Sequence, residues 1–99
     1  MRIEFDPAKD ALNIAKHGVS LHEARHLNWD WLCCCPDTRQ DYGELREIGY
    51  APIDERVYCV VFVQRGEVFR IVSLRKANSR EVIGYDNALQ ALQLRDPDR

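Results

Sequence analysis

Apolar positions in the first third of the chain follow a helical spacing. Arg2–Phe5 predicts a short strand, and Asp6–Pro7 then supplies an N-cap and a first helical residue. Gly18 is typical of a helix end, so the first helix is expected to stop there. A capping box over Ser20–Glu23 predicts a second helix through about residue 28. The apolar stripe that marks the first helix consists of Ala8, Ala11, Leu12 and Ala15.

Strand-like patterns fill the middle of the chain. The four segments are 31–35, 45–53, 56–63 and 68–75. Gly49 and Pro52 indicate that the second segment is bent or lies at a sheet edge. The third is a continuous β-branched and aromatic run, which is typical of a buried central strand. Residues 64–67 are expected to form the turn of a hairpin between the third and fourth segments.

The last predicted element is a helix that begins at Asn78–Glu81 and ends at about Leu94. The expected order is an N-terminal strand, two helices, an antiparallel meander of three to four strands and a C-terminal helix. Helices grouped apart from an antiparallel sheet define the α+β class. A chain of 99 residues has room for one core, so we expect a single domain over residues 1–95 with a frayed end at 96–99.

Composition narrows the class of protein. Apolar residues make up 45% of the chain, yet no apolar run approaches the roughly 20 residues of a membrane span. Acidic residues stand near the N-terminus where a signal peptide would be apolar, so we expect a cytoplasmic protein without membrane contact. Adjacent cysteines such as Cys33–Cys35 form only strained disulfides, and Cys59 lies in an apolar run, so reduced thiols are expected.

Positive charge is concentrated in one part of the chain. The net charge is −2, which does not indicate a nucleic-acid-binding protein. The stretch from residue 65 to residue 80, however, contains one acid, Glu67, and five cations, which are Arg65, Arg70, Arg75, Lys76 and Arg80. Arginine suits bidentate contact with phosphate. This stretch is therefore a candidate phosphate-binding region.

Four groups of residues between positions 5 and 85 form a recognisable series of motifs. The groups are Phe5-Asp6-Pro7-Ala8-Lys9 with Asn13 and Lys16-His17-Gly18-Val19, then Ser20-Leu21-x-Glu23-Ala24, then Asp41-x-Gly43-Glu44-x-Arg46, and last Arg70-Ile71-Val72-Ser73-Leu74-Arg75-Lys76-Ala77 with Arg80-Glu81 and Tyr85. In this order they resemble the motifs of the BrnT family of toxins. Three features depart from the family pattern, namely Phe5 in place of tryptophan, Ala51 where glycine is common, and the Cys33–Cys35 run.

This resemblance implies a RelE-like fold and a ribonuclease activity that halts translation. It also implies RNA as substrate and a cognate BrnA-type antitoxin with a ribbon-helix-helix part. Contact with operator DNA would then occur only through the antitoxin, and a heterotetramer with the antitoxin is one expected assembly. No cofactor or metal is expected for the reaction.

Cleavage of RNA without a metal requires a group that stabilises charge on phosphorus, which arginine can provide. Arg46, Arg70 and Arg75 are the candidates, and we expect their guanidinium groups to converge on one cavity. The alternative is that they form ion pairs with Glu44, Glu47 or Glu67 on a solvated face. In a regular strand Arg70 and Arg75 would point to opposite faces, so a bend or a site at the sheet edge would be needed.

Two residues are candidates for the general base that takes the proton from the 2′-hydroxyl group. Glu44 stands two residues from Arg46, on the same face of a predicted strand. A simple salt bridge is an equally good explanation of its position. His17 has a suitable intrinsic pKa, although a helix C-terminus favours histidine for its charge alone. The predicted catalytic residues are therefore Arg46, Glu44, Arg75 and His17.

Further polar residues are candidates for binding the RNA phosphates. Lys9, Asn13, Lys16 and Ser20 share one face of the first helix, which could follow an RNA backbone or simply be solvated. Tyr85 could stack on a base or lie in the core. The predicted phosphate-binding set is Lys9, Asn13, Lys16, Arg70, Ser73, Lys76, Arg80 and Tyr85.

Two other classes of function stay open on the sequence alone. One is a binding module without catalysis that still pairs with an antitoxin-like partner, which the acidic net charge favours. The other is a metal-binding or redox protein that uses the cysteines with His22 and His26, which are four residues apart. No spaced pair of cysteines supports a zinc site, so no metal ligands are predicted.

Overall fold

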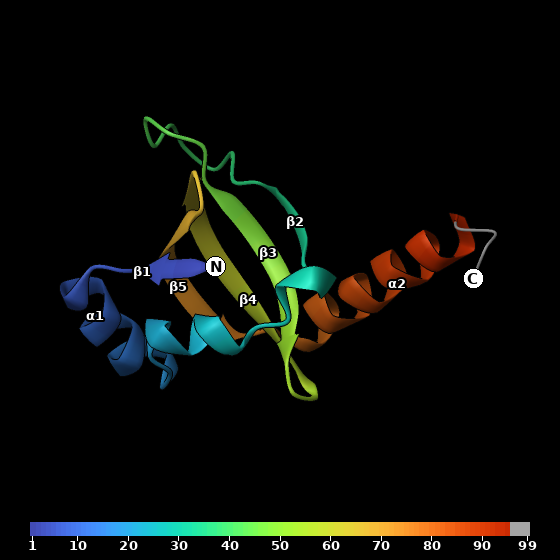
Figure 1. The fold of residues 1–99 in the computed structure, drawn as a ribbon. Helices are drawn as coiled ribbons and strands as arrows, with labels where there is room; N and C mark the ends of the chain where they lie inside the picture. The colour runs from blue at the N-terminus through green and yellow to red at the C-terminus, as the bar shows by residue number, and fades with distance from the viewer. Residues whose placement is uncertain (96–99) are drawn as a thin grey trace.

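A five-stranded mixed sheet forms the centre of the molecule (Figure 1). The structure is a computed structural model, which describes the backbone of residues 1–95 and the side chains of residues 1–92. The strands lie in the order β1-β5-β4-β3-β2, with β1 parallel to β5 and all other neighbours antiparallel. The predicted α+β class is confirmed. The elements are β1 (Arg2–Glu4), α1 (Pro7–His17), the 3-10 helices η1 (Leu21–His26) and η2 (Trp29–Trp31), β2 (Cys33–Pro36), β3 (Glu47–Ile53), β4 (Arg56–Arg65), β5 (Val68–Lys76) and α2 (Ser79–Arg95).

One face of the sheet carries the hydrophobic core. Phe62, Ile71 and Leu74 point to this face, and each is at most 1% exposed. The helices η1 and η2 lie across it (Figure 1), and Leu21 of η1 packs in the same buried cluster. The ring of Trp29 meets Phe62 edge-on, with 5.3 Å between ring centroids. We call the opposite side, to which alternation directs the side chains of residues 59, 61 and 63 of β4, the second face.

The helix α1 begins and ends where Asp6 and Gly18 predicted. The Asp6 side chain accepts a hydrogen bond from the Ala8 backbone N–H at 2.8 Å, so it caps the first turn. Gly18 adopts a φ of 74°, and its N–H donates to the Ile14 carbonyl oxygen at 2.8 Å. The apolar stripe of this helix faces solvent, however, and Leu12 is 70% exposed.

Asn13 attaches α1 to the sheet instead. Its side-chain nitrogen donates to the carbonyl oxygens of Leu74 and Val19, each at 2.8 Å, and its oxygen accepts from the Leu74 N–H at 3.2 Å. Because β1 pairs only with residues 68–70 of β5, the outer edge at Leu74 has no strand beside it. The buried amide of Asn13 takes the place of that strand and satisfies the backbone groups.

The second predicted helix is wrong in type and length. Residues 21–26 form the 3-10 helix η1, because Ser20 does not form a capping box with Glu23. The Ser20 hydroxyl accepts instead from the His22 N–H at 3.2 Å and donates to Asp10 of α1 at 2.9 Å. The predicted strand over 31–35 is also shifted, since Trp31 belongs to η2 and β2 is Cys33–Pro36.

The strand β3 was expected to be bent or to lie at a sheet edge, and the edge position is wrong for its first half because β3 lies inside the sheet. Residues 47–50 pair with β2 on one side and with β4 on the other. Gly49 fits there because a Cβ atom would lie 2.6 Å from Leu32 Cδ1. Pro52 lies beyond the end of the pairing with β2, which is where a residue without an N–H is tolerated. The strand starts at Glu47, two residues later than predicted.

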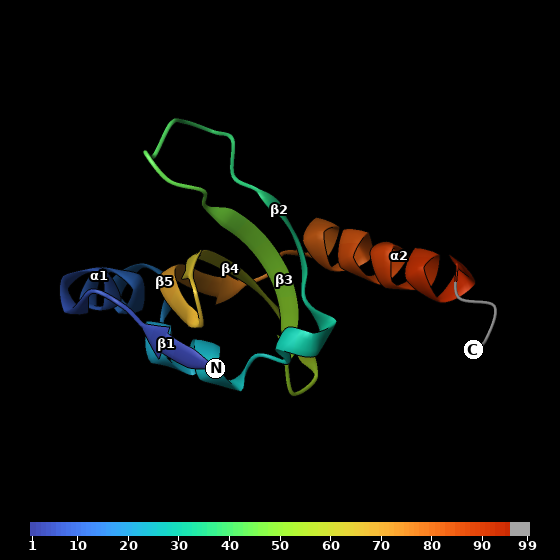
Figure 2. The same ribbon diagram turned by 45° about the horizontal axis from the view of Figure 1, so that its top comes forward.

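The helix α2 begins beside the sheet and projects away from it (Figure 2). Its predicted start at Asn78–Glu81 is confirmed, and the two residues form a capping box in which each accepts the other's backbone N–H at 2.9 Å. No helix in the described part of the chain combines the length and apolarity needed to cross a bilayer. The predicted frayed end at 96–99 lies outside the described residues.

Candidate functional site

A β-bulge at Val72 places Arg70 and Arg75 on the same face of the sheet. Arg70 pairs with Val63 and Arg75 pairs with Cys59, while the register between β4 and β5 shifts by one residue at Val61 and Phe62. Residues directly opposite one another share a face, and Val63 and Cys59 are four apart on β4. Both arginines therefore belong to the second face, and the bulge is the irregularity that their spacing requires.

Arg46, the residue before β3, also directs its side chain to the second face, and β3 and β5 lie on opposite sides of β4. The Asp37 N–H donates to the Arg46 carbonyl oxygen at 2.7 Å, which extends the ladder between β2 and β3 by one residue. Alternation from Glu47, which pairs with Phe62, directs Arg46 to the second face beside Val63. The Arg46 guanidinium lies 3.9 Å from the centre of the Tyr42 ring. Among the described residues, its Nε is a buried nitrogen without a hydrogen-bond partner.

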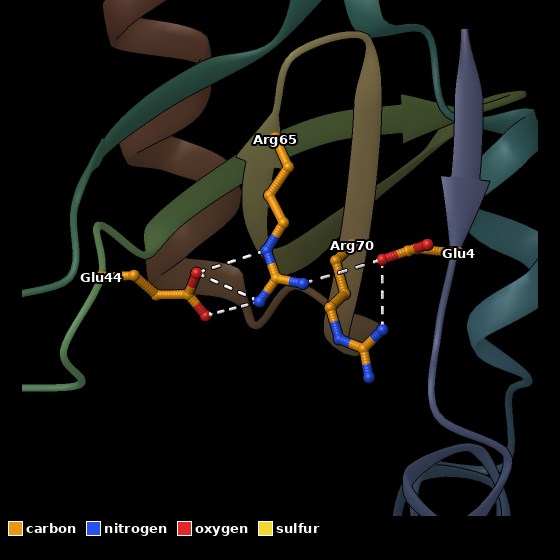
Figure 3. A network of polar contacts seen from close by, with 4 residues as sticks. All are labelled: Glu4, Glu44, Arg65 and Arg70. Carbon is orange, nitrogen blue, oxygen red and sulfur yellow. Dashed lines mark hydrogen bonds and ion pairs between the residues drawn. The ribbon is translucent and has the colours of Figure 1, made fainter.

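Two acids and two arginines form a network at the hairpin end of this face (Figure 3). Glu44 accepts three hydrogen bonds from Arg65, at 3.0 to 3.3 Å. Glu4 accepts one from Arg70 at 3.2 Å and lies 4.0 Å from Arg65. Glu44 is thus a loop residue paired with Arg65 rather than a strand neighbour of Arg46. All four side chains are at least a third exposed, so each pair contributes little to stability and an anion can compete for the arginines.

A second cluster surrounds Arg75 near the start of α2. Glu81 accepts hydrogen bonds from Arg75 Nη1 and Nη2 at 2.7 and 2.8 Å. It also accepts one from the Tyr50 hydroxyl at 3.0 Å. The Arg75 guanidinium, together with the bond from the Asn78 N–H, lowers the pKa of Glu81 to about 2. Burial raises the pKa of Tyr50, so this hydroxyl remains a donor at neutral pH.

His17 is the last residue of α1, and its pKa is shifted by its surroundings. Burial lowers the pKa of His17 below its ordinary 6.5, and the charges of Lys16 and Arg75 lower it further. The imidazole is therefore neutral at pH 7 and able to accept a proton. Asn13 attaches the same helix to Leu74, the residue before Arg75, and this contact fixes the end of α1 beside the site.

The remaining predicted residues divide into three groups. Ser73 pairs with Val61 and so shares the second face, and Lys9, Lys16 and Arg80 are exposed on their helices. Lys76 pairs with Tyr58 and belongs to the core side. Asn13 and Tyr85 are buried, and Tyr85 donates its hydroxyl hydrogen to the Trp31 carbonyl oxygen at 2.7 Å. The polar groups of both side chains form hydrogen bonds with backbone groups, so neither residue belongs to the proposed RNA-binding surface.

The three predicted clamp arginines share the second face of the sheet, and none of them lines the cavity on this face beside α2. A mainly apolar cavity of about 360 Å³ lies between β2, β3 and α2, and its lining includes Ile48, Tyr50, Glu81 and Tyr85. Arg70 and Arg75 are paired with Glu4 and Glu81, not with the acids named as alternatives. Within residues 1–92, no three His, Cys, Asp or Glu side chains gather as a metal-binding group.

Sequence reasoning missed three side chains that shape this face. Glu81 was identified as a helix cap and as part of the family motif, but no local spacing rule predicts its pair with Arg75. Tyr50 pairs with Cys59, which pairs with Arg75, so knowledge of the strand register would have found it. Tyr42 lies in the loop before β3 and carries no pattern that predicts its contact with Arg46.

Comparison with protein families identifies the family of this chain. Residues 5–81 match the family model described as the ribonuclease toxin BrnT of type II toxin–antitoxin systems. No curated protein matches the chain. The matched residues contain Arg46, Arg70, Arg75, His17 and Glu81 and extend over most of the chain.

Proposed function

Because the chain belongs to the BrnT family of ribonuclease toxins of type II toxin–antitoxin systems, we propose that its RNA-cleaving site is the second face of the sheet. The observation that carries this proposal is the bulge at Val72. It brings Arg70 and Arg75 to the face where Arg46 has a buried Nε without a partner among the described residues. A guanidinium with unused donors is suited to a phosphate oxygen.

The proposed reaction needs no metal ion. The 2′-hydroxyl of the RNA gives its proton to the general base and attacks phosphorus, the bond from phosphorus to the 5′-oxygen breaks, and the departing 5′-oxygen takes up a proton from water. Arg46, Arg70 and Arg75 bind the phosphate and stabilise the negative charge that develops on its oxygens. The ion pairs of Arg70 and Arg65 with Glu4 and Glu44 are exposed, so RNA phosphates replace the carboxylates at little cost. Ser73, Lys16, Lys9 and Arg80 contact neighbouring phosphates.

We assign the role of general base to His17. Its pKa is lowered by burial, Lys16 and Arg75, so the neutral form is present at pH 7. Glu44 is the second candidate, but its carboxylate is occupied by three hydrogen bonds from Arg65. RNA binding would have to release Glu44 before it could accept a proton.

The direct test is RNA cleavage by the purified protein in the presence of EDTA, with RNA supplied both free and on ribosomes. We expect the cleavage rate with EDTA to equal the rate without it. Products should end in a 2′,3′-cyclic phosphate, because the 2′-oxygen attacks the neighbouring phosphorus. Loss of cleavage in EDTA, restored by a divalent cation, would contradict the metal-independent mechanism.

The pH dependence of kcat/KM separates the two candidate bases. A general base acts in its deprotonated form, so kcat/KM should rise with pH up to the lowered pKa of His17, which lies below 6.5, and stay constant above that pKa. In His17→Gln the rise of kcat/KM at low pH should be absent, and the rate should be about 10²–10⁴-fold lower than in the wild type. If His17→Gln keeps the limb and Glu44→Gln removes it, Glu44 is the base.

The partner of a type II toxin is its antitoxin. We propose that this antitoxin is of the BrnA type and has a ribbon-helix-helix part. It covers the β4–β5 hairpin of the toxin, and the complex contacts operator DNA only through it. A heterotetramer is the proposed assembly, and the cytoplasm, where the RNA is, is the proposed location. We also propose that residues 1–95 form a single domain built on the one sheet.

A further inference from the structure

Glu81 uses both carboxylate oxygens in contacts that fix its own position. One oxygen accepts from Arg75 Nη1 at 2.7 Å and from the Asn78 N–H at 2.9 Å. The other accepts from Arg75 Nη2 at 2.8 Å and from the Tyr50 hydroxyl at 3.0 Å. The side chain is only 18% exposed. Glu81 is therefore held by the helix cap on one side and by the sheet on the other.

The same contacts leave one edge of the Arg75 guanidinium unused. A guanidinium has five N–H donors in a planar fork. Glu81 takes one hydrogen each from Nη1 and Nη2, and the Lys76 carbonyl oxygen accepts from Nη1 at 3.3 Å. Among the described residues, no acceptor takes the hydrogen on Nε or the second hydrogen on Nη2. These two hydrogens form the other bidentate edge of the group. That edge can bind two oxygens of one phosphate.

We propose that Glu81 and Tyr50 are positioning residues, which orient Arg75 so that its Nε and Nη2 edge binds the scissile phosphate. This inference rests on the proposed RNA site on the second face. Tyr50 belongs to the same row of the sheet as Arg75, because Tyr50 pairs with Cys59 and Cys59 pairs with Arg75. Its hydroxyl holds the Glu81 oxygen that faces Nη2, so it acts on Arg75 through Glu81.

Two substitutions remove these contacts with little change in shape. Tyr50→Phe deletes only the hydroxyl group. Glu81→Gln keeps an oxygen for the Asn78 N–H but replaces one acceptor of Arg75 with an amide donor. Since a displacement of about 1 Å can cost about 10²-fold, we expect kcat to fall about 10²-fold in Glu81→Gln. A smaller fall, about 3- to 10-fold, is expected in Tyr50→Phe, which leaves the bidentate pair intact.

Matched controls come from the other face of the molecule. Glu23→Gln changes an exposed acid of η1, 3.8 Å from His26, and Tyr58→Phe removes a hydroxyl on the core side of β4. Both should keep the wild-type kcat. The changes in Glu81→Gln and Tyr50→Phe should appear mainly in kcat, because a misdirected guanidinium still attracts the RNA by its charge.

The deciding readout is a double-mutant cycle with Arg75→Ala. A residue that acts through Arg75 has nothing to orient once Arg75 is gone, so neither substitution should lower kcat further by more than about twofold in that background. Losses of the same size with and without Arg75 would overturn the inference, as would wild-type kcat in both single variants. If Glu81→Gln does not fold, the cycle with Tyr50→Phe decides. Wild-type activity in Arg75→Ala itself would instead overturn the proposed site.

Discussion

Arg46→Ala is expected to lower kcat/KM for RNA cleavage by about 10²–10³-fold, which is the usual loss when one donor to a developing oxyanion is removed. Arg46 is the clamp arginine whose Nε, among the described residues, is buried without a partner. Arg70 and Arg75 already have carboxylate partners. The unused donors of Arg46 are therefore expected to gain most from a phosphate that carries extra charge. Measurement of kcat and KM on one RNA substrate gives the result.

The folded state should tolerate this substitution. Arg46→Ala removes the stacking on Tyr42, worth about 0.5–1 kcal/mol, but it also removes a buried nitrogen without a partner. The melting temperature should therefore change by less than about 5 °C. Arg56→Ala, an exposed arginine at the start of β4, is the matched control and should cleave RNA normally. Equal activity in the two variants would remove Arg46 from the site.

Asn13→Ala is expected to lower the free energy of unfolding by about 3 kcal/mol. The amide of Asn13 makes three hydrogen bonds, at 2.8, 2.8 and 3.2 Å, to backbone groups of Leu74 and Val19. The substitution leaves these groups unsatisfied in a buried place, at a cost of about 1–3 kcal/mol each before any relaxation. For a chain of this size, the expected fall in melting temperature is about 10–20 °C.

Lys9→Ala, at an exposed position of the same helix, is the control for this measurement and should leave the melting temperature within about 3 °C. Urea denaturation of both variants gives the free energies of unfolding. If Asn13→Ala unfolds at the wild-type urea concentration, the amide does not hold α1 to the sheet. The predicted role of Asn13 in RNA binding would then deserve a direct test.

Local signals were enough to predict the elements that depend on neighbouring residues. Asp6 and Gly18 set the ends of α1, and the Asn78–Glu81 box sets the start of α2, because a cap needs only residues a few positions apart. The continuous apolar run of β4 is also a local signal, and it correctly predicted that β4 lies in the middle of the sheet, between β5 and β3.

Features that depend on distant contacts could not be predicted. The exposed apolar stripe of α1 follows from Asn13, whose partner Leu74 is 61 residues away. The 3-10 form of η1 follows from the contact between Ser20 and Asp10, which competes with the capping box. The bulge at Val72 is a property of the pairing of two strands, and a single strand pattern does not contain it.

The sequence predicted which arginines belong to the candidate site, but not which acids pair with them. Arg46, Arg70 and Arg75 were chosen from motifs and from the cost of placing a cation in an apolar strand, and the structure places all three on one face. The acids that pair with two of them, Glu4 and Glu81, are not among the acids proposed as partners. Register and helix placement decide such pairs, and neither follows from residue type.

The central claim is that RNA binds the second face of the sheet through these arginines. It is tested most directly by the NMR signals of the arginine Nε–H groups during titration with an RNA oligonucleotide methylated at every 2′-oxygen, which cannot be cleaved. The signals of Arg46, Arg70 and Arg75 should shift together with one binding constant, while those of Arg25 and Arg56 stay unchanged. Shifts at Arg25 or Arg56, with the three arginines of the second face unaffected, would contradict the claim.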